Sequence, residues 1–264
     1  MNLPSATQIK EHLKHHFLFW GVIFLVIVLA TFYFFGYRPG PGLTFSRIGF
    51  VEILNIPDGT TVYTDASSRG FATGGSLRAN LVPGNHTVIV DAPNMQPWQT
   101  IISVTSNQTT AVVPVLVTKQ PESRQLTGNE RTEALMLLNV AKLPSEASPL
   151  SMGCTQVFNL GNRIIAAATT STECTPPEFL CSEDGTCEPT VIFSPIEPLR
   201  SVVAFPGHDD VIVMTVGEWI YVLGLDPRTP QFFAPLARGT APKLATYKGK
   251  IIVGDAGNVY ELSL

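Results

Sequence analysis

The sequence predicts a mainly β protein with one N-terminal transmembrane helix, a small β-sandwich and a C-terminal antiparallel β-repeat that resembles an incomplete propeller. Three observations predict this fold class: an uncharged apolar run near the N-terminus, short β-branched and aromatic segments separated by Pro, Gly and Asn, and a recurring Ile/Val-Tyr pattern near the C-terminus. We expect the segments to be a cytoplasmic tail at 1–16, the transmembrane helix at 17–37, the sandwich at 38–118, a linker with a short helix at 119–153 and the repeat domain at 154–264.

Composition excludes one class of partner. Charged residues make up 14% of the chain and the net charge is −4, so the sequence has no cluster of Lys and Arg that could neutralise phosphates. We therefore predict no nucleic-acid partner.

The apolar run at 17–37 has the length of a transmembrane helix. It contains no charged side chain, and at 1.5 Å per residue its 21 residues span roughly the 30 Å hydrocarbon core of a bilayer. Trp20, Tyr33 and Tyr37 lie near its ends, where amphipathic rings settle at the headgroups. A cleaved signal peptide is the alternative, but it would have a shorter apolar run followed by a small-residue cleavage site. We predict an uncleaved anchor in contact with membrane lipid.

Flanking charge alone does not set the orientation of this helix. Lys10 and Lys14 precede it, and Arg38 and Arg47 follow it. The tail before it is too short to fold, whereas the large C-terminal part carries all four cysteines. We therefore expect a single-pass protein of the cell membrane, with the N-terminus cytoplasmic and the C-terminal bulk extracytoplasmic.

Short strands and tight turns are predicted between 49 and 117. The turn chemistry rests on Pro57 and Gly59 in one connection and on Pro83 and Gly84 in another. The expected strands lie at 50–56, 61–64, 76–81, 86–91, 99–105 and 110–117.

These residues resemble a PEGA domain, a small surface β-sandwich of bacterial and archaeal envelope proteins. The tetrapeptide that gives the family its name falls on 57–60, which reads Pro-Asp-Gly-Thr and keeps the Pro-x-Gly turn, and 81–86 matches the Leu-x-Pro-Gly-x-His turn. The segment at 65–70 departs from the family, in which Asp-Gly more often closes this hairpin directly. The resemblance implies binding to a cell-wall polymer, a surface-layer protein or another envelope protein.

The C-terminal part reads as a β-repeat after a short helix at 130–142. The pattern at 211–226 is echoed at 251–262, at about the 40-residue period of a propeller blade. Residues 154–264 suffice for two or three blades, whereas closure needs about four. With too few blades to close, the repeat would either form an open sheet or pair its edges with another subunit. A homo-oligomer is therefore one of the two expected outcomes. The strands are expected at 156–160, 163–169, 190–194, 201–205, 211–216, 219–224, 231–234, 251–254 and 258–262.

The four cysteines predict disulfides. Cys181 and Cys187 flank an Asp-Gly turn and can face each other across a hairpin, which leaves Cys154 for Cys174. A zinc site with four cysteine ligands is the rival interpretation, but it needs pairs of cysteines separated by only two to four residues, which these spacings do not supply.

No motif for catalysis, a cofactor or a metal is found in the sequence. The one chemical candidate is His208 with Asp209 and Asp210, near Trp219, and this run is more typical of a solvated turn. We therefore predict a non-enzymatic, membrane-anchored envelope protein without a cofactor that mediates surface or cell-wall binding or protein-protein interaction. The alternative is a membrane-anchored enzyme or sensor with a ligand pocket in the C-terminal β-repeat.

Overall fold

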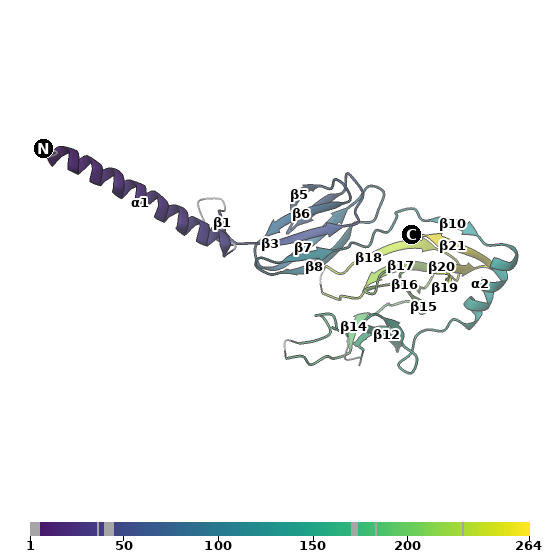
Figure 1. Cartoon of the computed structure of the whole chain (residues 1–264). Helices are drawn as coiled ribbons and strands as arrows, with labels where there is room; N and C mark the ends of the chain where they lie inside the picture. Colours follow the sequence, from purple (N-terminus) through teal and green to yellow (C-terminus); the bar gives the residue numbers. More distant parts are fainter. Residues whose placement is uncertain (1–5, 36, 40–44, 170–173, 183, 229) are drawn as a thin grey trace. The chain divides into compact units, whose positions relative to one another are not determined.

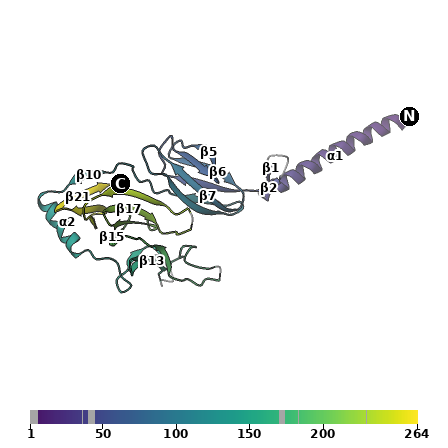
Figure 2. The ribbon, with the colours of Figure 1, turned by 180° about the vertical axis from the view of Figure 1, so that it is seen from behind.

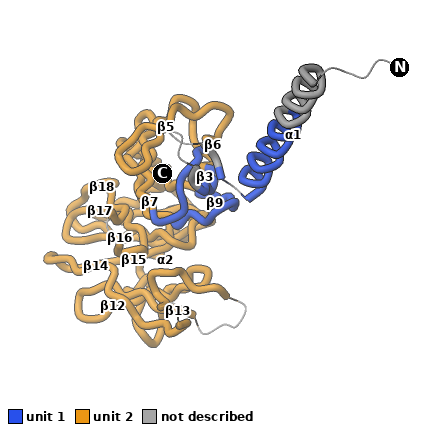
Figure 3. Tube along the Cα trace, turned by 90° about the vertical axis from the view of Figure 1, so that its left-hand side faces the viewer, with its two compact units in different colours: residues 1–52, 78–85, 103–112 blue, residues 53–77, 86–102, 113–264 orange. Residues whose placement is uncertain are grey.

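The computed structural model describes residues 6–35, 37–39, 45–169, 174–182, 184–228 and 230–264. Within these residues the chain forms two α-helices and many short strands in several sheets (Figure 1), so the prediction of a mainly β protein is confirmed. The chain divides into two compact units, coloured separately in Figure 3. The first comprises residues 1–52, 78–85 and 103–112, and the second comprises 53–77, 86–102 and 113–264.

Helix α1 (Ala6–Phe34) covers most of the predicted apolar run. It begins inside the segment predicted to be a tail, because residues 6–16 contain neither Pro nor Gly to stop a helix. It ends before Tyr37, which lies in β1 (Tyr37–Pro39), paired with β2 (Phe45–Arg47). Among the residues described here, no helix is both long enough and apolar enough to cross a bilayer. The predicted transmembrane helix is therefore not found in the described part of the chain.

A three-stranded sheet in the order β6-β3-β9 lies mostly in the first unit. Its strands are β3 (Gly49–Leu54), β6 (Ser76–Leu81) and β9 (Thr109–Val112). Buried and less buried side chains alternate along β3 and β6, as expected for strands with one face in a core. Gly49 has no room for a side chain, because a Cβ there would meet the backbone of Thr105.

The sheet β5-β4-β7-β8 lies mostly in the second unit and is formed by β4 (Thr61–Thr64), β5 (Ser67–Phe71), β7 (Gly84–Asp91) and β8 (Trp98–Val104). The turn before β4 is closed by the Pro57 carbonyl, which accepts bonds from the Thr60 amide at 3.2 Å and the Thr60 hydroxyl at 2.6 Å. Gly59 in this turn has φ +81°, and Gly84 at the start of β7 has φ +139°. Strand β5 was not predicted, because its Ser-Ser-Arg-Gly sequence resembles a turn.

Three four-stranded antiparallel sheets make up the described C-terminal part. Two are formed by consecutive strands, β11-β12-β13-β14 and β15-β16-β17-β18, and the third has the order β10-β21-β20-β19. The strands are β10 (Glu122–Gln125), β11 (Leu150–Met152), β12 (Thr155–Leu160), β13 (Arg163–Ala168), β14 (Thr190–Phe193), β15 (Leu199–Ala204), β16 (Val211–Val216), β17 (Trp219–Gly224), β18 (Phe233–Arg238), β19 (Lys243–Tyr247), β20 (Lys250–Asp255) and β21 (Asn258–Ser263).

Two apolar clusters hold these sheets. One joins the first two sheets, with Val157 and Ile164 from one and Ile212 and Met214 from the other. The second lies under helix α2 (Gly128–Val140), where Ala134 and Leu138 pack on the third sheet. Both views of the ribbon place α2 beside β10 and β21 (Figures 1 and 2).

Two expectations for this region need correction. No propeller is found in the described residues; what is present is three antiparallel sheets of four strands each. The segment at 119–153 is also more than a linker with a helix, because it supplies β10, which pairs with β21 in antiparallel register. Strand β10 has no apolar residue, and its side chains are all exposed, so the sequence carries no hydrophobic signal for it.

Candidate functional site

The four cysteines form the two predicted disulfides, Cys154–Cys174 and Cys181–Cys187, and none of them is free. Cys181 and Cys187 face each other as an antiparallel bridge whose turn is closed by the Thr186 carbonyl, which accepts a bond from the Ser182 amide at 2.9 Å. Both disulfides lie on the connections around β12 to β14, so their role is to hold this sheet and its long β13-β14 connection together.

The His-Asp-Asp run forms the predicted turn before β16. The His208 amide donates to the Phe205 carbonyl at 3.2 Å, and the His208 ring packs edge-on against the Phe205 ring at 5.5 Å. His208 Nδ1 lies 3.8 Å from Asp210 Oδ1, too far for a hydrogen bond. The described residues contain no group of three or more His, Cys, Asp or Glu side chains arranged to hold a metal ion.

Asp210 nevertheless lines a cavity of about 220 Å³ within the second unit. The wall includes Trp98 of β8, Leu225 after β17 and Phe232 before β18, which are 6%, 1% and 5% exposed. Phe179 of the disulfide-bearing connection completes the aromatic lining. The cavity therefore has an apolar, largely aromatic wall built from segments far apart in the sequence.

Four charged side chains also line this cavity: Glu178, Asp210, Asp226 and Arg228. The Arg228 guanidinium donates two hydrogen bonds to the Asp226 carboxylate, from Nε at 2.9 Å and from Nη2 at 2.6 Å. Its Nη1 lies 3.7 Å from Glu178. The hydrogen bond to Asp226 raises the pKa of Arg228. Partial desolvation by the surrounding protein raises the pKa of the Asp210 carboxyl, an effect that neighbouring His208 opposes, although 71% of the side chain is exposed to solvent.

Hydrogen bonds of Gln231 connect three strands, β8, β14 and β17. Its side-chain Nε2 donates to the Gly224 carbonyl at 2.9 Å and to the Ile192 carbonyl at 3.2 Å, while its own backbone carbonyl accepts a bond from Gln99 Nε2 at 3.3 Å. The charged and aromatic residues of the cavity are thus carried on segments joined by hydrogen bonds. No local spacing predicts this grouping, which sequence reasoning missed.

A row of aromatic rings forms a second notable feature. The ring of Phe193 stacks on Phe233 at 5.5 Å, Phe233 on Tyr221 at 4.7 Å, and Tyr221 on Trp219 at 6.2 Å, and the Arg238 guanidinium lies 5.5 Å from the Trp219 ring. Phe193 and Tyr221 pack against the cluster between the first two sheets, whereas Phe233 and Trp219 are 44% and 38% exposed. We call these four rings with Arg238 the aromatic row.

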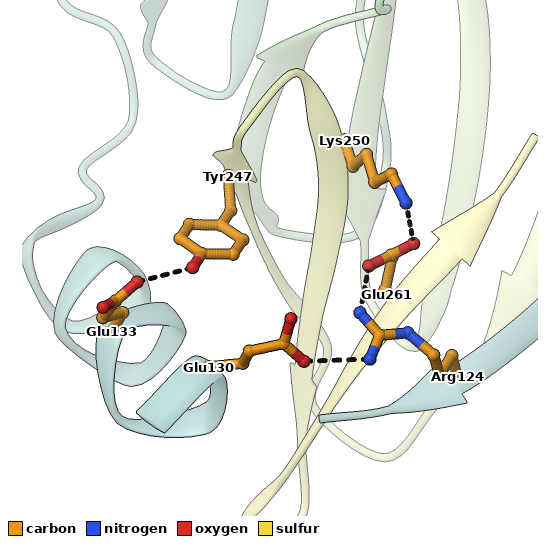
Figure 4. Close-up of polar contacts among 6 residues, drawn as sticks. All are labelled: Arg124, Glu130, Glu133, Tyr247, Lys250 and Glu261. Atoms are coloured by element: carbon orange, nitrogen blue, oxygen red, sulfur yellow. Dashed lines mark hydrogen bonds and ion pairs between the residues drawn. The ribbon is translucent and has the colours of Figure 1, made fainter. Parts of the chain in front are cut away.

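An ion-pair cluster secures β10 (Figure 4). Arg124 donates through Nη2 to Glu261 at 2.7 Å and through Nη1 to Glu130 of α2 at 2.9 Å, and Lys250 also bonds Glu261. The bonds from Lys250 and then Arg124 lower the pKa of Glu261, which is buried. Each charged group has an opposite partner here, so the cluster joins β10, β20, β21 and α2 and serves the fold.

No family model matches this chain, and no curated protein does so either. The resemblance to PEGA domains therefore stays a prediction that rests on the turn residues named above.

Proposed function

We propose that this chain is a non-enzymatic, membrane-anchored envelope protein whose β-rich part binds another envelope component. The observation that carries the binding role is the aromatic row. Trp, Tyr and Arg are the residue types that dominate binding energy at protein interfaces, and here they lie together on partly exposed strands.

Helix α1 is the proposed anchor. Its described side chains from 19 to 34 carry no charge, and large apolar ones are strongly exposed, with Phe24 at 69% and Phe34 at 84%. An apolar helix surface of this kind is favourable only against lipid or protein. The choice of lipid rests on the length of the uncharged run at 17–37 in the sequence, and not on a membrane-spanning helix in the described residues. The two disulfides favour an oxidising compartment for the rest of the chain, with the N-terminus in the cytoplasm.

The binding partner is proposed to be an envelope protein or a cell-wall polymer, in line with the PEGA resemblance. The two are separated by incubating the detergent-solubilised full-length protein either with isolated peptidoglycan or with an envelope protein extract. We expect Trp219→Ala to reduce retention of the partner about tenfold, because a truncated interface hot spot costs more than 1 kcal/mol.

Phe71→Ala is the matched control, since Phe71 is an exposed aromatic residue on β5, outside the aromatic row. It should leave retention unchanged. Equal retention by wild type and Trp219→Ala, with both disulfides intact, would contradict the proposed binding role of the row.

A second candidate function is a membrane-anchored enzyme or sensor, and the cavity beside Asp210 favours it. A catalytic role would use a carboxyl whose pKa is raised by desolvation, as that of Asp210 is. Loss of a measured hydrolytic activity in His208→Ala or Asp210→Asn would support this candidate over the binding protein.

A further inference from the structure

We propose that the cavity beside Asp210 binds a cationic side chain, namely the ammonium or guanidinium group of a Lys or Arg residue of another polypeptide. Cation binding here does not depend on the aromatic row. It adds a second, charge-selective site to the protein.

The size of the cavity favours one side chain over a whole small molecule. Its volume is about 220 Å³, whereas sites for drug-sized ligands measure roughly 300 to 1,000 Å³. Trp98 and Phe232 provide a nearly fully buried apolar wall. Such a wall suits the methylene stem of Lys or Arg.

The charges that line the cavity favour a positive ligand. Glu178, Asp210 and Asp226 carry three carboxylates, and Arg228 is the one cation among the described residues that line the cavity. Arg228 is held by both oxygens of Asp226, so that pair is neutral. The Arg228 contact also shows that a guanidinium fits between carboxylates at this place.

Asp210 is the group left for the ligand. Its closest ion-pair contact among the described residues is His208 Nδ1 at 3.8 Å, and its side chain is 71% exposed. A cation entering the cavity can therefore reach the carboxylate without displacing a hydrogen-bonded side chain. An anionic ligand would meet an uncompensated negative charge instead, so the site also selects against acidic residues.

The apolar wall and the charged groups of the cavity are carried by different elements of the fold. Trp98 lies on β8, Asp210 precedes β16, and Arg228 follows β17. The hydrogen bonds of Gln231 and Gln99 join β8 to the end of β17, and the Leu225 amide donates to the Asp210 carbonyl at 2.8 Å. The site is therefore largely formed before the ligand arrives, which lowers the ordering cost of binding.

The test is calorimetric titration of the full-length protein in detergent with the blocked tripeptide acetyl-Ala-Lys-Ala-amide. A second peptide carries norleucine, which keeps the stem and removes the charge, and a third carries Glu. We expect the Lys peptide to bind at least tenfold more tightly than the norleucine peptide, and the Glu peptide not to bind.

Two variants locate the binding in the cavity. Asp210→Asn removes the charge at nearly constant shape and should weaken binding of the Lys peptide about tenfold. Asp209→Asn makes the same change of net charge at the neighbouring residue, which does not line the cavity. This variant should change binding by less than about twofold.

Three results would overturn the proposal: no binding of the Lys peptide, equal binding of the norleucine peptide, or equal weakening by Asp210→Asn and Asp209→Asn. These results are distinguishable from failure of the proposed function, because retention of an envelope partner is measured separately with Trp219→Ala.

Discussion

Two of the four-stranded sheets are secured in opposite ways. In the sheet β11-β12-β13-β14 the strands follow one another in the chain, and two disulfides tie down the connections. In the sheet β10-β21-β20-β19 the edge strand comes from more than a hundred residues earlier, and no disulfide crosses it. Helix α2 and the Arg124 cluster hold that strand in place.

The difference follows from how each sheet is connected. The first sheet has a long connection at 169–189 whose described residues form no named strand or helix, and ordering such a segment costs conformational entropy that a disulfide removes from the unfolded state. The third sheet instead gains β10 as an edge strand and is covered by α2, whose Ala134 and Leu138 bury apolar surface on the sheet. Disulfides in one sheet and apolar burial in the other thus offset the entropy cost of ordering the chain.

The largest expected effect is on the disulfide-held sheet. Replacing all four cysteines by Ala should lower the free energy of unfolding by about 5 kcal/mol, of which about 3 kcal/mol comes from the longer Cys154–Cys174 loop and about 2 kcal/mol from the Cys181–Cys187 loop. Urea unfolding of the full-length protein in detergent measures the loss. Reduction of the wild-type protein is the control and should give the same change. A loss below about 1 kcal/mol would mean that the connection is held by packing alone.

The next effect is on the helix-held sheet. Leu138→Ala empties a buried position under α2, where the Leu138 side chain lies against Gly254, and should cost about 3 kcal/mol. Leu137→Ala is the matched control, because Leu137 lies on the same helix and is 36% exposed. Urea unfolding should therefore separate the two variants clearly. Similar stabilities for both would contradict the assigned packing of α2.

The smallest effect concerns the ion pairs of β10. Arg124→Gln removes one partner of Glu261. Because the Arg124 side chain is 56% exposed and Lys250 still pairs with Glu261, we expect only a few-fold faster hydrogen exchange of the amides in β10. Arg163→Gln on β13 is an exposed control that should leave these amides unchanged. Unchanged exchange of the β10 amides in Arg124→Gln would contradict this prediction. It would mean that backbone hydrogen bonds and α2 alone hold β10 on β21.

The same cluster predicts a pH dependence. The pKa of Glu261 is lowered in the folded protein from its ordinary 4.5, so its contribution to stability is fully present above about pH 4.5 and is lost as the pH falls through the lower, folded value. Protection of the β10 amides should therefore fall on acidification below this range. The sheet closed by disulfides should keep its protection over the same range, since those bonds do not titrate. Parallel loss in both sheets would contradict the assignment to Glu261.

Local sequence signals predicted part of this fold. Strands β16 and β17 lie where expected because 211–216 is almost wholly apolar and fully buried, and Gly217 with φ +58° turns the chain between them. The Cys181–Cys187 pairing followed from the Asp-Gly turn between the two residues. Both features depend on residues that are close in sequence.

Two of the features that were missed depend on distant residues. Strand β10 has the polar sequence Glu-Ser-Arg-Gln and becomes a strand only because β21 presents an edge to it. The cavity unites Trp98, Asp210 and Arg228 from three separate connections or strands, and no spacing in the sequence indicates that they meet. Long-range pairing of this kind has no one-dimensional signature.

The central proposal is that α1 holds the chain in a membrane while the cysteine-bearing part lies in an oxidising space. The most direct measurement extracts membranes that contain the full-length protein with alkaline carbonate and then alkylates the denatured chain without reduction before mass analysis. We predict that the protein stays with the lipid and that none of its four cysteines is alkylated. Recovery in the aqueous fraction with four alkylated cysteines would contradict both parts of the proposal.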